Sequence, residues 1–115
     1  MHYRQKRRYP RVPIDRPSLA RVLDPEPFQR PFEDFTRTRV LGSGGCMFLS
    51  PEPVGFGSLM ELHIALGERV VRADSRVVYE REHGQGEHEV GVEFLRMSPA
   101  DRAYVESVVA ARAGA

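Results

Sequence analysis

Short stretches in which apolar and polar residues alternate make up most of this chain. The clearest runs from residue 60 to residue 66, where every second side chain is apolar: Met60, Leu62, Ile64 and Leu66. A repeat of two places successive side chains on opposite faces of an extended strand, whereas a helix needs a repeat of about 3.6. The alternation therefore predicts a chain built mainly of strands with one buried face.

Further segments read as strands, at residues 19–23, 35–41, 46–49, 68–80 and 90–94. Turns rich in glycine and proline separate them, notably at 42–45, 50–58 and 83–86. Within 35–41 we expect one face to hold Phe35, Arg37, Arg39 and Leu41. We expect the inward faces of the last two strands to hold every second residue from Val71 to Tyr79, and then Val90, Val92 and Phe94.

The chain ends in a segment with helix signals. Ser98 suits an N-cap, Pro99 suits the first helical position, and the acid Asp101 follows. An apolar stripe then recurs with helical spacing: Tyr104, Val105, Val108 and Val109. Gly114 is placed to end the helix. The order of elements predicts an all-β fold with one C-terminal helix, a six-stranded antiparallel β-barrel with the helix against it.

Length and composition allow one domain of 115 residues, of which 41% are apolar. The single cysteine, Cys46, forms no internal disulfide, which fits a reducing compartment. No apolar run approaches the ~20 residues that span a bilayer. The basic N-terminus is not followed by an apolar stretch, so it does not read as a secretory signal. We expect a cytoplasmic protein.

Charge is distributed unevenly along the chain. Residues 1–16 hold six basic side chains and one acid, a local charge of +5, so the other residues carry −4 to give the net +1. Three prolines, at 10, 13 and 17, disfavour helix in this segment. We therefore predict a basic N-terminal arm at residues 1–17 that meets an anion, and a barrel with its helix at residues 18–115.

Two short motifs resemble those of the PilZ domain family. The arm reads Lys6-Arg7-Arg8-Tyr9-Pro10-Arg11-Val12-Pro13, close to the family's R-R-x-x-x-R followed by Val-Pro, with Lys6 in place of the first arginine. The family's D/N-x-S-x-x-G corresponds to residues 40–45, where only Gly45 matches. Val40 replaces the acid or amide, and Gly42 replaces the serine. The stretch from Val90 to Arg102 also resembles the family's last strand and the start of its helix.

The resemblance implies a receptor for the second messenger cyclic di-GMP that relays its level to a protein partner, with no cofactor and no catalysis. The implied ligand-binding residues are Lys6, Arg7, Arg8, Arg11, Gly42, Ser43, Gly44 and Gly45. A guanidinium can fork onto guanine or onto phosphate oxygens, and glycines let backbone N–H groups approach a ligand. Because Val40 and Gly42 lack the family's polar groups, the alternative is an adaptor that has lost the nucleotide and works through protein contacts.

Simpler interpretations stand beside these. The arm is either a ligand-binding segment or a solvated tail, and the 42–45 turn is either part of a site or a plain turn whose glycines need positive φ. Cys46 opens an apolar strand and is expected in the core. The histidines lack metal-ligand spacing with Cys46, so no metal site is expected. No catalytic set of residues is present, and nucleic acid is an unlikely partner because the chain beyond the arm is acidic.

Overall fold

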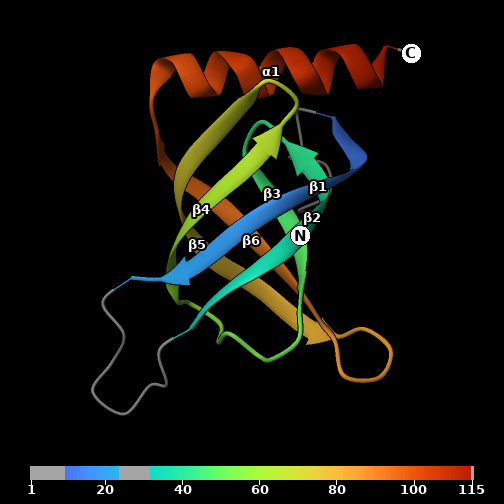
Figure 1. Ribbon diagram of the computed structural model, residues 1–115, viewed down its shortest axis with the longest axis vertical. Coiled ribbons are helices and arrows are strands. Elements are labelled where there is room, and N and C mark those ends of the chain that lie inside the picture. The colour runs from blue at the N-terminus through green and yellow to red at the C-terminus, as the bar shows by residue number, and fades with distance from the viewer. Residues whose placement is uncertain (1–9, 24–31, 115) are drawn as a thin grey trace, which may run out of the picture.

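The structure is a computed structural model that describes residues 10–23 and 32–114. The elements within these ranges are β1 (Arg11–Val22), β2 (Glu33–Gly42), β3 (Gly45–Ser50), β4 (Leu59–Leu66), β5 (Arg69–Glu82), β6 (His88–Met97) and α1 (Pro99–Ala113). The strands close into an antiparallel barrel in the order β1-β2-β3-β6-β5-β4, and α1 lies across one end (Figure 1). The predicted six-stranded antiparallel barrel with a C-terminal helix is confirmed.

Strand β1 is much longer than the apolar run that predicted it. It begins at Arg11, so residues 11–17 of the predicted arm form part of the barrel wall. This half of β1 pairs with β2, and its pairing with β4 begins only at Ser18. In this half, the side of β1 that faces away from β2 has no partner strand. Prolines at 13 and 17 can be accommodated here, because a proline nitrogen on an unpaired side of a strand removes no hydrogen bond of the sheet.

A β-bulge at Arg39 changes the face that Leu41 occupies. Thr38 and Val40 pair with neighbouring residues of β3, so Arg39 between them is an extra residue in β2. An extra residue reverses the alternation beyond it. Leu41 is fully buried, as Thr38 is, while Arg39 remains exposed. The prediction that Leu41 shares a face with Arg39 is therefore wrong.

A second bulge, in β5, moves Tyr79 out of the core. Val77 pairs with Val92, but Tyr79 pairs with the adjacent Gly91, so Val78 is the extra residue. Val77 is fully buried, whereas Tyr79 is half-buried on the outer wall. The prediction of an inward Tyr79 is wrong for the same reason as at Leu41.

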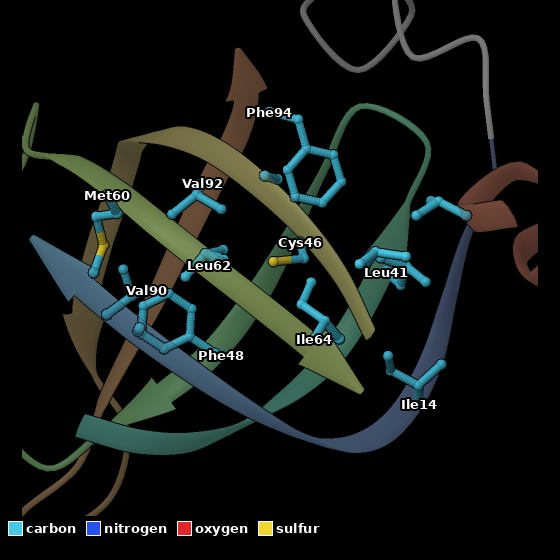
Figure 2. Packing of buried hydrophobic residues seen from close by; sticks show 14 of the residues in the cluster. Ile14, Leu41, Cys46, Phe48, Met60, Leu62, Ile64, Val90, Val92 and Phe94 are labelled. Atoms are coloured by element: carbon cyan, nitrogen blue, oxygen red, sulfur yellow. The ribbon is translucent and has the colours of Figure 1, made fainter. Parts of the chain in front are cut away.

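The barrel interior is filled by apolar side chains from all six strands (Figure 2). The inward faces predicted for residues 60–66 and for the last strand are confirmed, since these side chains are buried: Met60, Leu62, Ile64, Leu66, Val90, Val92 and Phe94. Cys46 lies in the same cluster, as expected of a core residue, and burial raises the pKa of its thiol to about 12.

Helix α1 begins as its sequence predicts. The Ser98 hydroxyl accepts a hydrogen bond from the Asp101 backbone N–H at 3.0 Å, which caps the helix. Val105 and Val109 are buried against the barrel end, and the Tyr104 hydroxyl donates to the Leu66 carbonyl at 2.7 Å. These contacts hold α1 across that end of the barrel. Its length and polarity do not suit a membrane crossing, and the same holds for every helix in the described part of the chain.

Candidate functional site

The candidate site lies where the start of β1 meets the turn between β2 and β3. In the register of these strands Arg11 pairs with Gly42. The two residues touch, because a Cβ added to Gly42 would lie 3.3 Å from the Cγ of Arg11. The fold thus brings the last arginine of the first motif against the turn of the second. The other basic residues predicted for the site, Lys6, Arg7 and Arg8, lie outside the described residues.

The four predicted turn residues differ in accessibility. Gly42 and Gly45 are buried, Ser43 has an exposed fraction of 9%, and Gly44 is exposed. A Cβ added to Gly44 would meet no atom within 4 Å, so the backbone is open to a ligand at this position. Backbone N–H groups of such an open turn can contact an anion directly.

Positive φ does not explain the glycines of this turn. In the described chain the glycines with positive φ are Gly55, Gly57, Gly67, Gly84 and Gly86, which all lie elsewhere. The interpretation of the 42–45 turn as a plain turn that needs positive φ is therefore wrong. At Gly45 the requirement is steric, because a Cβ there would lie only 2.2 Å from the Val92 carbonyl oxygen. The one glycine that matches the family motif is thus needed for strand packing.

Backbone contacts fix the turn on two sides. The Gly44 carbonyl accepts a hydrogen bond from the Phe94 N–H at 2.9 Å, which ties the turn to β6. The Ser43 carbonyl accepts one from the Arg102 guanidinium at 3.2 Å, which ties it to α1. The turn is therefore held in one position against both neighbouring elements.

The two acids at the start of β2 do not replace the carboxylate missing at position 40. Val40 is half-buried and pairs with Pro13 and Met47, so the outer wall is apolar at this point. Glu33 pairs with Arg21 and Asp34 with Ala20, at the other end of β1 from Arg11. Neither acid can therefore supply the group that the turn lacks.

Tyr79 is a candidate ligand-contacting residue that the sequence did not indicate. It pairs with Gly91, and Gly91 pairs with Met47, which is the partner of Val40. The ring covers the bare backbone of Gly91, since a Cβ there would lie 2.0 Å from the Tyr79 ring. The outer wall across β3 and β6 from Val40 is thus lined by an aromatic ring packed against the sheet.

Hydrogen bonds and a nearby charge fix the Tyr79 phenol. Its hydroxyl donates to Glu89 at 3.1 Å, and Arg81 donates to the same carboxylate at 3.1 Å. Burial raises the pKa of Tyr79, and the Glu89 charge raises it further. The positive charges of Arg81 and, more weakly, of Arg11 act in the opposite direction on this pKa. The register places Tyr79 across β6 and β3 from Val40, which lies two residues before the 42–45 turn.

The sequence model of the PilZ domain family matches residues 5–111 of this chain. A comparison with curated proteins finds no match. Several solved structures share the fold at low sequence identity.

The inhibitor of motility MotI/DgrA from Bacillus subtilis superposes with a TM-score of 0.76 at 16% identity, over 95% of this chain and 51% of that one. The PilZ domain of YcgR from Escherichia coli, solved with c-di-GMP, superposes with a TM-score of 0.69 at 16% identity, over 96% of this chain and 93% of that one. The MrkH–c-di-GMP complex from K. pneumonia superposes with a TM-score of 0.71 at 15% identity, over 92% of this chain and 52% of that one.

This chain thus spans about half of the MotI/DgrA and MrkH chains and nearly all of the YcgR PilZ domain. At these identities the structures show a shared fold, while the match to the family model extends over almost the whole sequence. The chain belongs to the PilZ domain family.

Proposed function

We propose that this protein is a non-catalytic effector that binds cyclic di-GMP and relays the level of this messenger to a protein partner. The observation that carries the proposal is the register of β1 on β2, which sets Arg11 beside Gly42 and so joins the two motifs. The YcgR PilZ domain and MrkH were solved with c-di-GMP, which supports the choice of ligand. Lys6, Arg7 and Arg8 belong to the same basic motif as Arg11.

The groups at the site suit the chemistry of this ligand, which has two phosphates and two guanines. The Arg11 guanidinium offers paired donors for phosphate oxygens or for guanine O6 and N7. The open backbone at Gly44 can approach the ligand closely. Tyr79 offers a flat ring on which a base can stack, an interaction that contributes about 1–3 kcal/mol per base.

The apolar character of position 40 changes how the site must work. Val40 and Gly42 supply no side-chain hydrogen bond, and each lost polar contact costs about 1–3 kcal/mol. We infer that Arg11 and Tyr79 supply a correspondingly larger share of the binding energy. The ligand is then held by charge and stacking more than by hydrogen bonds from the turn.

The relay needs no chemical reaction. A ligand bound between Arg11 and Tyr79 adds two phosphates to the outer wall and changes the charge and shape of that surface. A protein partner that contacts this surface can therefore distinguish the free and bound states. On the sequence grounds given above, we place this role in the cytoplasm.

A second candidate function is an adaptor that works through protein contacts without nucleotide. The observation in its favour is that the two positions where the family places polar side chains carry Val40 and Gly42. Glu33 and Asp34 pair with the other end of β1 and do not take their place. The two functions differ in one measurable property, the affinity for cyclic di-GMP.

Calorimetry of the full chain with cyclic di-GMP tests the proposal. We expect saturable binding that weakens as salt rises, because the ligand is a dianion and the site is cationic. Arg16→Ala is the control, since Arg16 lies further along β1 and pairs with Thr38. Absence of binding at ligand concentrations of about 1 mM, which corresponds to a free energy near −4 kcal/mol, would overturn the proposal in favour of the adaptor.

A further inference from the structure

Arg102 reaches the candidate site from a third element of the fold. It lies in the first turn of α1, where its backbone N–H donates to the Ser98 carbonyl at 2.9 Å. Its guanidinium crosses to the β2–β3 turn and donates to the Ser43 carbonyl at 3.2 Å. Figure 1 shows α1 lying over the end of the barrel where this turn is found.

Both ends of this contact are fixed before any ligand arrives. The start of α1 is held by the Ser98 cap and by Asp101, which accepts from the Arg69 guanidinium at 2.8 Å and from the Arg72 N–H at 3.1 Å. The turn is held by the hydrogen bond from Phe94 to Gly44. The position of the Arg102 guanidinium is therefore defined by the fold.

The charge of Arg102 is also available. Many arginines of the outer wall are neutralised by carboxylates, as Arg37 is by Asp15 and Arg81 by Glu89. Arg102, in contrast, forms no ion pair with any carboxylate in the described ranges, and the residue is half-buried. A guanidinium has five N–H donors, and the Ser43 carbonyl accepts a hydrogen bond from one nitrogen.

We propose that Arg102 is a further ligand-binding residue, which contacts a phosphate of the dianion held at Arg11 and the 42–45 turn. The proposal rests on the proposed function, because it concerns the same site. Arg11 flanks the turn at Gly42, and Arg102 flanks it at Ser43. Both contacts fall on the two residues that precede the open Gly44 backbone, and guanidinia bind phosphate through charge-assisted hydrogen bonds.

This contact couples the ligand to α1. A ligand that bonds to Arg102 stabilises the arrangement of helix and turn in which the guanidinium faces the site. By linkage, whatever displaces α1 must weaken ligand binding by the same free energy. The helix therefore gives a partner protein a second route, besides the changed outer wall, by which to sense the ligand.

The test is calorimetry with cyclic di-GMP over a range of salt concentrations, on the full chain and three variants. Arg102→Gln removes the charge but keeps a donor for the Ser43 carbonyl. Arg102→Lys keeps the charge. Arg112→Gln is the matched control, because Arg112 is in the same helix and also donates to a backbone carbonyl, that of Pro13 at 3.4 Å.

We expect Arg102→Gln to weaken binding about tenfold or more and to flatten its salt dependence. Arg102→Lys should keep the salt dependence, and Arg112→Gln should weaken binding much less than Arg102→Gln, because Arg112 contacts Pro13 of β1 and not the 42–45 turn. A purely structural role for Arg102 would not alter the salt dependence.

The possible failures are distinct. Binding by the unchanged chain, with equal affinity and salt dependence in Arg102→Gln, overturns this inference and leaves the proposed function intact. Absence of binding by the unchanged chain overturns the proposed function and this inference together.

Discussion

The ring of Tyr79 lies directly on the backbone of Gly91, so closely that a Cβ at residue 91 would sit 2.0 Å from a ring carbon. The phenol is held at its other end by Glu89. An aromatic side chain fixed in this way loses little further freedom when a base stacks on it, which favours binding. The pair therefore provides a rigid contact surface on the outer wall of β5 and β6.

Replacing Tyr79 should separate stacking from hydrogen bonding in the ligand site. Tyr79→Ala should weaken cyclic di-GMP binding by about 1–3 kcal/mol, because the stacking surface is removed. Tyr79→Phe keeps the ring and should retain most of the affinity. Calorimetry measures both, and equal binding by Tyr79→Ala and the unchanged chain would show that the ring does not contact the ligand.

A side chain at residue 91 should destabilise the barrel. Gly91→Ala pushes the Tyr79 ring off the sheet, and overpacking of this kind costs about 1–3 kcal/mol. The double change Gly91→Ala with Tyr79→Ala should recover part of that loss, since the clash is removed. Urea unfolding of the unchanged chain, the two single variants and the double variant gives the coupling energy. If the Tyr79 ring and residue 91 are in contact, the double variant should be more stable than the sum of the two single losses predicts.

Arg11 should be essential for nucleotide binding. Arg11→Ala removes hydrogen bonds to a charged ligand and should cost about 1.5–3 kcal/mol of binding free energy. The same change at Arg16, which pairs with Thr38 further along β1, should have little effect. Titrations of the two variants under one salt condition compare them, and equal losses would point to a nonspecific effect of charge.

Restoring the family's polar groups should tighten binding. Val40→Asp adds an acceptor for guanine N–H groups, and with Gly42→Ser it should raise the affinity about tenfold. A Cβ at residue 42 would come within 3.3 Å of Arg11, so that side chain must shift slightly. Val40→Asp alone therefore serves as the comparison, and a double variant that binds more weakly than this single one would show that the shift is harmful.

The carboxylate of Glu61 should make stability depend on pH in acid. It is buried on β4 and accepts hydrogen bonds from Arg21 and Arg72, and the Arg72 bond is the main reason that its pKa falls from 4.5 to about 2. A carboxyl with a lowered folded-state pKa stabilises the fold above pH 4.5 and loses this effect as the pH falls toward about 2.

Glu61→Gln should accordingly lower the urea midpoint at pH 7, with the difference from the unchanged chain shrinking between pH 4.5 and about 2. Glu93→Gln is the control, because the Glu93 side chain is 48% exposed and lies 4.0 Å from its partner Arg76. A pH-independent difference for Glu61→Gln would mean that packing, and not charge, explains its effect.

The sequence predicted those features that depend on neighbours along the chain. The cap at Ser98 and the stripe of Val105 and Val109 define α1 locally, and the alternation at residues 60–66 defines β4 locally. The predicted buried faces of β4 and α1 are confirmed. The register of β4 on β5 runs without a bulge, so the alternation along β4 continues unbroken. The strand count followed from the same local signals.

Features that depend on a partner strand could not be predicted. Arg39 is an extra residue only because β2 pairs with β3 in a shifted register, and Val78 is one only because β5 pairs with β6 in the same way. These two bulges decide which face of the barrel Leu41 and Tyr79 occupy. The meeting of Arg11 with the 42–45 turn was implied by the family motifs. Tyr79 joins that region through strand register, which a single sequence does not reveal.

The burial of Cys46 gives the molecule an internal reporter of its own opening. It is the only cysteine in the chain, and its thiolate, the form that reacts with alkylating reagents, is suppressed in the closed barrel. Alkylation at neutral pH must therefore wait until β3 separates from its neighbours. The labelling rate then measures how often the native barrel opens, with no introduced probe and in a chain that has no tryptophan to serve as one.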